Sequence, residues 1–151
     1  MKKTKKSPVL NFIGEIRTPF DETNCPRHAD EKLKAEARIF VFPKYRPGLK
    51  DLEKFKYIYV LFYLDRPHKP VSMIAHPPYL KGKEVGVFAS RSPNRPNPVA
   101  FSVVRLKRIE KGALITSAID AYDRTPLIDI KPYFKGEDHK HKSNDGWLKQ
   151  E

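Results

Sequence analysis

The sequence predicts an all-β fold, in which a single sheet closes into a barrel of about seven strands with short helices and long loops. Seven runs rich in β-branched and aromatic residues alternate with proline- and glycine-containing segments, a pattern typical of strands and turns. Helical spacing of apolar residues is almost absent. Closure is expected because an open sheet would leave two unpaired edges. The runs are residues 9–18, 35–42, 55–64, 85–89, 99–109, 113–118 and 127–133.

The first two runs are each ended by a proline. Residues 9–18 alternate apolar and polar side chains before Pro19, and residues 35–42 stop at Pro43. Proline ends a strand because it has no N–H group to donate to a neighbouring strand. The polar, turn-rich residues 20–34 between them predict a loop, which is either a plain connection or one that faces a ligand.

A short helix and a central strand come next. Two leucines three residues apart predict one or two helical turns within residues 47–54. Residues 55–64 (FKYIYVLFYL) are dense in aromatic and β-branched residues and predict a central strand. This strand ends abruptly at Asp65 and Arg66, and a proline-punctuated loop occupies residues 69–83.

The most unusual local sequence is a stiff loop, residues 90–98 (SRSPNRPNP), between two strand-like runs. The preceding residues 85–89 predict a buried strand. Three prolines in the loop fix φ and push the residues before them toward extended geometry. Two arginines and two asparagines therefore sit on a backbone that needs little ordering to meet a polar ligand. The alternative is a proline-rich strand connection with solvated arginines.

The chain continues with a hairpin and a last strand. Residues 110–112 end in a glycine that permits positive φ, so they predict a tight turn before the run at residues 113–118. Residues 119–126 then form an acidic loop. The last run, residues 127–133, is short because Pro132 stops it.

Length and composition indicate one domain with a core of its own. The chain has 151 residues, of which 39% are hydrophobic. We expect a basic flexible tail at residues 1–8, the barrel domain at residues 9–135 and a polar carboxy-terminal tail at residues 136–151. There is no long apolar run and no secretory signal, so a cytoplasmic protein without a membrane span is expected.

Charge points to a polyanionic partner. The formal net charge is +12 and the isoelectric point is near 9.8, which favours a partner such as nucleic acid. Part of the excess lies in the tails, where basic residues often serve only solubility. The single cysteine, Cys25, excludes an intrachain disulfide and any metal site built from several cysteines.

Several kinds of chemistry are excluded by missing motifs. The sequence has no Gly-rich phosphate loop, no dinucleotide fingerprint, no zinc-ligand spacing and no glycine elbow around a serine. His139 and His141 lie in a lysine-rich run that is typical of solvated tails, so no metal is expected. Composition and motifs taken alone therefore indicate a basic β-domain that binds RNA.

Several ordered motifs resemble the TsaA/TrmO family of S-adenosylmethionine-dependent tRNA methyltransferases, which act on N6 of a threonylcarbamoyl-modified adenosine next to the anticodon. Residues 86–98 (GVFASRSPNRPNP) are similar to the family signature, and residues 123–133 (DRTPLIDIKPY) are similar to its closing motif. Further resemblances are IGEIRTP at residues 13–19, PRH at 26–28 and LEKF at 52–55. Ordered motifs at family spacing are far more specific than any single loop.

The resemblance implies a single-sheeted barrel that binds S-adenosylmethionine and forms a homodimer. Arginines and loop amides would meet the methionine carboxylate, a carboxylate would take a ribose hydroxyl or the amino group, and an aromatic ring would cover the adenine. Each position also has a structural alternative, such as a surface ion pair, a core side chain or a turn aspartate. By position, the cofactor contacts are Pro26, Arg27, His28, Asp65, Arg66, Arg91, Phe101, Tyr122 and Asp123.

Methyl transfer to an exocyclic amine needs alignment and a place for one proton. We hypothesise that Asp129, Lys131 and Tyr133 orient the target base, with Asp129 accepting the N6 hydrogens. Arg95 and Asn97 would contact the anticodon loop of tRNA across the mouth of the site. Alternatively, Asp129 only ties Lys131 and the closing strand, and Tyr133 only ends the barrel.

The sequence departs from the family pattern in three places. Residues 99–102 read VAFS where the family usually has Ile-Gly-Leu-Ser, which reshapes the expected cofactor pocket. Arg124 replaces the usual glycine and adds a charge beside the site. The chain ends at Glu151, so a short form without the carboxy-terminal domain of longer members is expected.

Three functions are compatible with these residues. The first is the tRNA methyltransferase. The second is a barrel that uses S-adenosylmethionine for a different RNA or small-molecule acceptor or senses it as a ligand. The third is a non-enzymatic RNA-binding β-domain, which rests on charge alone.

Overall fold

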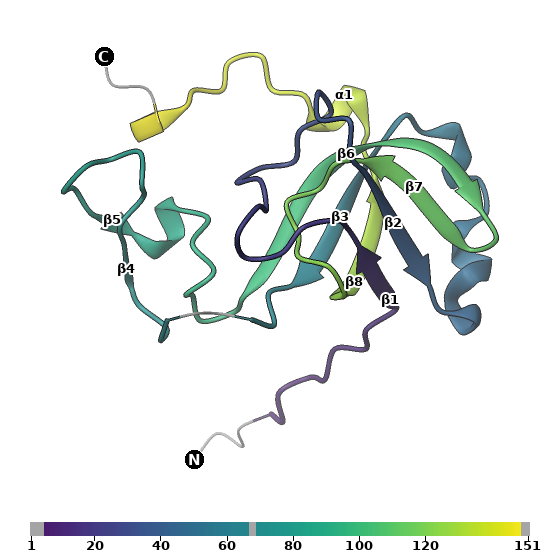
Figure 1. Cartoon of the computed structure of the whole chain (residues 1–151), viewed down its shortest axis with the longest axis horizontal. Coiled ribbons are helices and arrows are strands. Elements are labelled where there is room, and N and C mark those ends of the chain that lie inside the picture. The colour runs from purple at the N-terminus through teal and green to yellow at the C-terminus, as the bar shows by residue number, and fades with distance from the viewer. Residues whose placement is uncertain (1–4, 67–68, 149–151) are drawn as a thin grey trace.

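The computed structural model describes residues 5–66 and 69–148, and its centre is a closed β-barrel. Six of the eight strands in this part of the chain form the barrel, in the order β1-β2-β7-β6-β3-β8 (Figure 1). Every neighbouring pair is antiparallel, so the predicted all-β barrel is confirmed. The barrel strands are β1 (Gly14–Arg17), β2 (Glu36–Val41), β3 (Tyr57–Tyr63), β6 (Val99–Glu110), β7 (Ala113–Ser117) and β8 (Thr125–Pro132).

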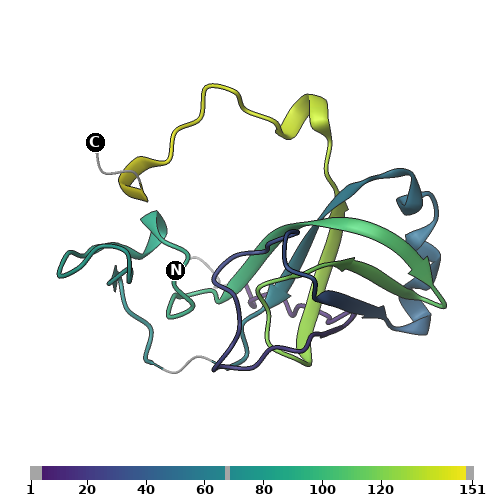
Figure 2. The same cartoon turned by 45° about the horizontal axis from the view of Figure 1, so that its top comes forward.

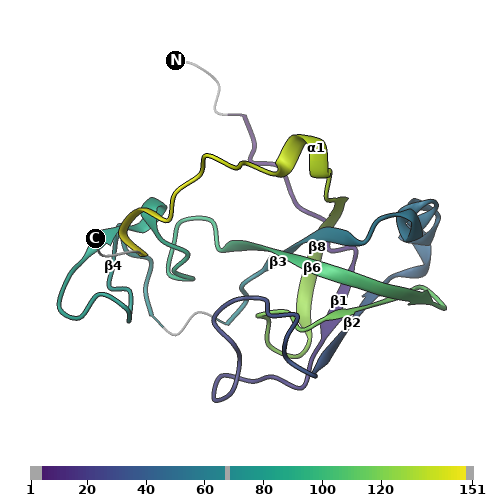
Figure 3. The ribbon, with the colours of Figure 1, turned by 90° about the horizontal axis from the view of Figure 1, so that it is seen from above.

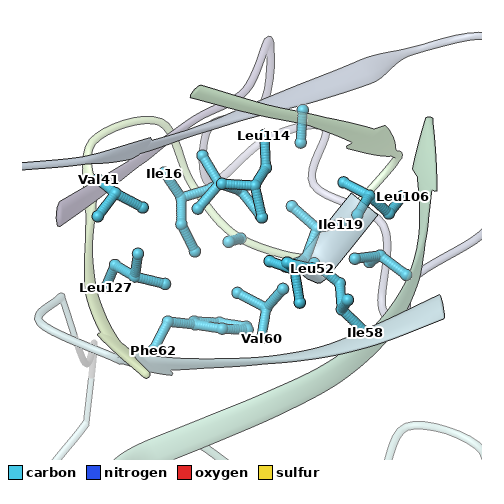
Figure 4. Packing of buried hydrophobic residues seen from close by; sticks show 14 residues of the cluster. Ile16, Val41, Leu52, Ile58, Val60, Phe62, Leu106, Leu114, Ile119 and Leu127 are labelled. Carbon is cyan, nitrogen blue, oxygen red and sulfur yellow. The ribbon is translucent and has the colours of Figure 1, made fainter. Parts of the chain in front are cut away.

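The barrel interior is filled by alternate residues of each strand. On β3, Ile58, Val60 and Phe62 are at most 1% exposed, while the residues between them face outward. This alternation follows from the two-residue side-chain period of a strand. Figure 4 shows these side chains facing others across the barrel, such as Val41 of β2 and Leu114 of β7. The interior is therefore a packed core.

Gly14 allows β1 and β2 to approach each other closely. A Cβ atom added at Gly14 would lie 1.8 Å from the carbonyl oxygen of Phe40, far inside van der Waals contact. In the register between these strands, Gly14 pairs with Val41 and Glu15 pairs with Phe40. A glycine is required here because no other residue leaves the strand room for its neighbour's backbone.

Short helices cover one end of the barrel. The helices η1 (Pro43–Leu49) and η2 (Leu52–Lys54) connect β2 to β3, which confirms helical turns near residues 47–54. They begin earlier than the leucine spacing indicates, because Pro43 stands in the first turn, where it needs no N–H partner. Arg46 donates from Nε to the carbonyl oxygen of Val41 at 3.0 Å and fixes η1 to the sheet. No helix within residues 5–66 and 69–148 is long and apolar enough to cross a membrane.

The predicted strand at residues 85–89 is wrong. Only β5 (Val85–Gly86) is a strand, it pairs with β4 (Ile74–Ala75), and Val87–Ala89 form the short helix η3. Figure 3 shows this two-stranded ribbon beside the barrel, so it is not one of the barrel strands. An apolar run does not by itself specify a strand. Here Val87 is buried and Phe88 is 78% exposed, so Val87 is the one residue of this apolar run with a buried side chain.

The carboxy-terminal segment returns from the barrel to the ribbon. It leaves β8 through α1 (Lys135–Asp138) and arches to η4 (Gly146–Leu148), as Figures 1 and 2 show. The indole N–H of Trp147 donates to the carbonyl oxygen of Ala89 at 2.7 Å. The part of the predicted polar tail that the structure describes is therefore anchored at its far end. Of the predicted basic tail, residues 5–8 are exposed, and residues 1–4 lie outside the described residues.

Candidate functional site

One end of the barrel gathers the long loops. Because neighbouring strands are antiparallel, β1, β3 and β7 end there, and β2, β6 and β8 begin there. We call this the loop end, formed by residues 18–35, 64–66, 69–98 and 118–124. The opposite end, with η1, η2 and the hairpin turn at residues 110–112, is the helix end. Eight of the nine expected cofactor contacts lie in loop-end segments, and the ninth, Phe101, lies near the start of β6.

Asp123 is the centre of a hydrogen-bonded turn. Its Oδ1 accepts from Arg17 Nε at 2.9 Å and from the backbone N–H of Thr18 at 3.1 Å. Its own N–H donates to the carbonyl oxygen of Phe20 at 2.8 Å. Partial burial raises the pKa of Asp123, but the bonds from Arg17 and Thr18 outweigh burial and leave the pKa below its ordinary value. The carboxylate thus joins two segments, residues 17–18 and the loop at residues 118–124.

Arg66, which follows β3, also binds this turn. Its Nη2 donates to the carbonyl oxygen of Asp123 at 2.7 Å and to Thr125 Oγ1 at 3.2 Å, and its Nε donates to Asp65 at 3.2 Å. The guanidinium also lies 5.3 Å from the centre of the Tyr122 ring. Asp65, Arg66, Tyr122 and Asp123 therefore form one cluster. The sequence leaves two alternatives for Asp65 and Arg66, cofactor contacts or a surface ion pair, and the structure joins the pair to this cluster.

Asp120 is a half-buried carboxyl that the sequence analysis did not select. It accepts a hydrogen bond from Ser102 Oγ, which points inward from β6. Burial raises the pKa of Asp120, while the Ser102 bond and the positive charges of Arg91 and His28 oppose the rise. These charges come from two different loops, so Asp120 lies where those loops converge. Its position three residues before Asp123, inside an acidic loop, was the only signal in the sequence.

The loop that carries Pro26, Arg27 and His28 is held against this site by the backbone. Asp30 N–H donates to the carbonyl oxygen of Ala118 at 3.2 Å, two residues before Asp120. Arg27 reaches the other way, and its guanidinium lies 5.1 Å from the centre of the Tyr79 ring. Burial raises the pKa of the neighbouring Cys25 thiol to about 11, so it is protonated and unreactive at neutral pH.

Arg91 and Phe101 meet on the outer face of the barrel. The Arg91 guanidinium lies 5.4 Å from the centre of the Phe101 ring, and Phe101 is 49% exposed. The possibility that Phe101 belongs to the core is thereby excluded, because the odd-numbered residues of β6 from Val99 to Lys107 are exposed. An exposed ring beside a guanidinium can stack against a flat heterocycle and hold an anion at its edge.

The expected catalytic residues lie along the same outer face, on β8. Asp129, Leu61 and Phe101 form one row across β8, β3 and β6. Two strand spacings separate Asp129 from Phe101, a backbone distance of about 10 Å. Lys131 lies one row further from the loop end, opposite Tyr59. Tyr133 lies beyond it, and its ring centre is 5.6 Å from that of Tyr59.

Asp129 and Lys131 form an ion pair. Lys131 Nζ lies 2.8 Å from Asp129 Oδ2, and Asp129 Oδ1 accepts from the backbone N–H of Ile130 at 2.9 Å. The hydrogen bond from Lys131 to Asp129 raises the pKa of the lysine. Lys131 also borders a shallow apolar hollow of about 300 Å³. The hollow is lined by Tyr59, Leu61, Val99, Ala100, Phe101 and Lys131.

Arg95 has an internal role in the stiff loop. Its Nη1 donates to the carbonyl oxygens of Ser90 at 2.9 Å and Ser92 at 3.4 Å, so it holds the backbone on both sides of Arg91. Asn97, the other expected RNA contact, is exposed. Within the described residues, no group of three or more His, Cys, Asp or Glu side chains is placed to hold a metal ion.

Comparison with known proteins identifies the family. Residues 15–139 match the model of the tRNA-methyltransferase O N-terminal domain. The chain is 37% identical over 141 residues to a probable S-adenosyl-L-methionine-binding protein of Archaeoglobus fulgidus, covering 93% of this chain and 38% of that protein. It is 36% identical to the mouse tRNA (adenine(37)-N6)-methyltransferase, covering 84% of this chain and 29% of the mouse protein.

Structural comparison gives the same result. A crystal structure of TrmO from P. aeruginosa superposes with a TM-score of 0.78 and 31% sequence identity, covering 96% of this chain and 63% of the other. This chain therefore spans only part of the length of these three proteins. The family model covers most of the chain, including β1 to β8 and the loop end. The chain belongs to the family of the tRNA-methyltransferase O N-terminal domain, the TsaA/TrmO family.

Proposed function

We propose that this protein is an S-adenosylmethionine-dependent methyltransferase that acts on N6 of threonylcarbamoyl-adenosine next to the anticodon of tRNA. The observation that carries the proposal is the convergence of Arg91, Phe101 and Asp120 at the loop end, from three separate segments. Family membership supports it, since relatives are named as S-adenosylmethionine-binding proteins and as tRNA (adenine(37)-N6)-methyltransferases. A tRNA substrate implies the cytoplasm as the compartment.

The residues at the loop end fit the chemical parts of S-adenosylmethionine. The cofactor carries a carboxylate, an ammonium, a sulfonium and a flat adenine, and it supplies the methyl group. Arg91 has a ring contact but no ion pair with a described residue, so its charge is available to a carboxylate. Asp120 offers a carboxylate to the ammonium or to a ribose hydroxyl, and the half-exposed Phe101 ring offers a surface to the adenine.

Asp129, Lys131 and Tyr133 are proposed to orient the target adenine on the outer face of β8. In this arrangement N6 forms a bond to the transferred methyl carbon and releases one proton, which Asp129 accepts. The row that joins Asp129 to Phe101 supports this role, because the acceptor and the cofactor would then lie side by side. Both oxygens of Asp129 already have partners, Lys131 Nζ and the Ile130 N–H, so Asp120 is the second candidate for the proton acceptor.

The anticodon loop of tRNA is the proposed partner, and its contacts include Arg95 and Asn97. The net charge of +12 supports a polyanionic partner. Because Arg95 already binds two loop carbonyls, its contribution to RNA binding would come through the shape of the loop as much as through charge. Asn97 is exposed and free to approach a base or a phosphate directly.

A homodimer is proposed through the outer face of β3 and β6. Val99, Phe101 and Val103 are each between 37% and 49% exposed, and they continue the apolar lining of the hollow. A contiguous exposed apolar surface is typical of an interaction site. A second copy seated there would place its own residues beside Phe101. Sedimentation analysis of the wild-type protein and of Val103→Lys tests this: a dimer that dissociates in the variant is expected, and a monomeric wild-type protein would contradict it.

Two measurements together test the proposed function. Titration calorimetry should show S-adenosylmethionine binding, and no binding at high micromolar concentration would exclude the enzyme and the sensor alike. Mass spectrometry of tRNA nucleosides from a deletion strain should show threonylcarbamoyl-adenosine lacking one methyl group. Binding without any change in the nucleosides would instead support a barrel with a different acceptor. RNA binding without cofactor binding would support a non-enzymatic RNA-binding domain.

A further inference from the structure

Arg124 occupies an unusual backbone position at the loop end. Its φ angle is +65°, in the left-handed region that favours glycine. Two other described non-glycine residues have positive φ, Asp51 and Lys111, and both lie at the helix end. Arg124 is exposed, so neither packing nor burial accounts for a large side chain there.

The turn that carries Arg124 is held rigidly on both sides. On one side, Asp123 is bonded to Arg17, Thr18 and Arg66. On the other side, Thr125 Oγ1 donates to the carbonyl oxygen of Tyr122 at 2.7 Å and accepts from Arg66. A side chain on such a base loses less backbone freedom when it binds a ligand.

Three other arginines of this region already bind acidic or carbonyl oxygens within the protein, whereas Arg27 and Arg91 have contacts with aromatic rings. Arg17 and Arg66 bind carboxylates, and Arg95 binds carbonyl oxygens. The Arg124 guanidinium makes no hydrogen bond, ion pair or ring contact with any described residue. It is therefore a cation without a partner among residues 5–66 and 69–148. Arg124 lies four positions after Asp120 in the sequence, so the Cα atoms of the two residues are at most about 14 Å apart.

We propose that Arg124 binds a backbone phosphate of the RNA substrate, next to the nucleotide whose base enters the site. This rests on the proposed function and adds a contact to it, because Arg124 directly precedes β8, the strand whose Asp129 is proposed to meet the target base, so a flanking phosphate of that nucleotide would come near the 122–125 turn. An arginine fork matches a phosphate with two parallel N–H donors. The contact positions the strand and carries no sequence information.

The test compares two substitutions that change the charge and the backbone in the same way at opposite ends of the barrel. Arg124→Gly and Lys111→Gly each remove one positive charge and each relieve a positive φ, of +65° and +48° respectively. The probe is an RNA hairpin with the sequence of a tRNA anticodon stem-loop, titrated at several salt concentrations. Arg124→Gly should weaken binding about tenfold, and the slope of log K against log salt should fall by about 0.7 to 1. Lys111→Gly should leave both unchanged.

Two further results separate this proposal from others. Arg124→Lys should restore most of the salt slope, because the charge stays in place. S-adenosylmethionine binding, measured by calorimetry, should be the same in Arg124→Gly as in the wild type. Equal loss of RNA affinity in both glycine variants would overturn the proposal, because the charge would then act without regard to position. An absence of RNA binding by the wild-type protein would instead refute the proposed function itself.

Discussion

The Arg91 guanidinium lies 5.4 Å from the centre of the Phe101 ring, so the stiff proline loop and the start of β6 meet on one outer surface of the barrel. Phe101 is thereby held between a cation on one side and the row that leads to Asp129 on the other. The expected cofactor contacts and the expected catalytic residues are joined through this one ring.

Replacing Arg91 by alanine should weaken S-adenosylmethionine binding about tenfold or more. A hydrogen bond between charged groups contributes about 1.5–3 kcal/mol, and alanine cannot replace it. Arg105→Ala is the matched control, since Arg105 also projects outward from β6 but lies two rows further from the loop end. Calorimetry on both variants checks this, and equal affinities would show that Arg91 does not hold the cofactor.

Asp129→Asn should lower the turnover number about a hundredfold or more if Asp129 takes the proton from N6. The amide keeps the size of the side chain and its bond from Ile130 N–H, so the fold should not change. Single-turnover rates on modified tRNA measure the effect. If Asp129→Asn had normal turnover and Asp120→Asn lost about a hundredfold, Asp120 would be the residue that accepts the proton.

Asp120→Asn should make the protein more stable at neutral pH. The pKa of Asp120 is raised by burial, so the folded state binds its proton more tightly than the unfolded state does. The stability of the wild type therefore falls as pH rises from the ordinary carboxyl pKa through the raised one, and it stays lower above that range. Thermal unfolding should show a higher Tm for Asp120→Asn at pH 7 and a smaller difference in acid.

Asp123→Asn should have the opposite pH dependence. The pKa of Asp123 lies below its ordinary value, so the charged form stabilises the folded state at neutral pH, and this contribution is lost as pH falls through the lowered pKa. The variant should lose about 1 kcal/mol at pH 7, since the bond from Arg17 is half exposed. Denaturant titrations at pH 7 and in acid measure the change in the free energy of unfolding. At pH 7 this change should be a loss for Asp123→Asn and a gain for Asp120→Asn.

Gly14→Ala should destabilise the barrel by about 3 kcal/mol, because its Cβ would overlap the carbonyl oxygen of Phe40 in the paired strand. Gly86→Ala is the control. Gly86 has a φ of −61°, which alanine adopts freely, and a Cβ there would meet nothing within 4 Å. Denaturant unfolding of both variants measures the difference. Equal stability would show that β1 can shift away from β2 without cost.

Ligand binding should change the fluorescence of Trp147. It is the only tryptophan in the sequence, and its indole N–H is bonded to the carbonyl oxygen of Ala89, two residues before Arg91. A ligand that engages Arg91 should therefore alter its emission. Titration with S-adenosylmethionine checks this, with Arg91→Ala as the variant in which the change should disappear. An unchanged spectrum at saturation would show that the carboxy-terminal segment is not coupled to the loop.

The barrel could be predicted because its strands carry local signals. Residues 55–64 combine aromatic and β-branched residues, and the structure places β3 within them. Residues 85–89 have a similar composition but form a short strand and a helical turn, because a ladder needs a partner and the partner here is only Ile74–Ala75. Strand pairing over long sequence separations is not visible in local composition.

Ordered motifs in the sequence select Arg91, Phe101 and Asp123, which the structure brings to the loop end and to the start of β6. Asp120 was missed because what distinguishes it is its environment: its partner Ser102 is 18 positions away, and Arg91 and His28 come from other loops. The internal bonds of Arg95 were missed for a related reason, since a guanidinium that folds back on its own loop looks the same in sequence as one that faces solvent.

A barrel whose hydrogen-bond ladder is closed has no edge onto which another strand can be added. New material can therefore enter through the connections or at the ends of the chain, and residues 69–98 between β3 and β6 show the first case, since they form a ribbon, a helix and a proline loop of their own. Stability and specificity are thus carried by different parts of the chain. Substrate preference can diverge in the loops while the fourteen-residue core stays as it is.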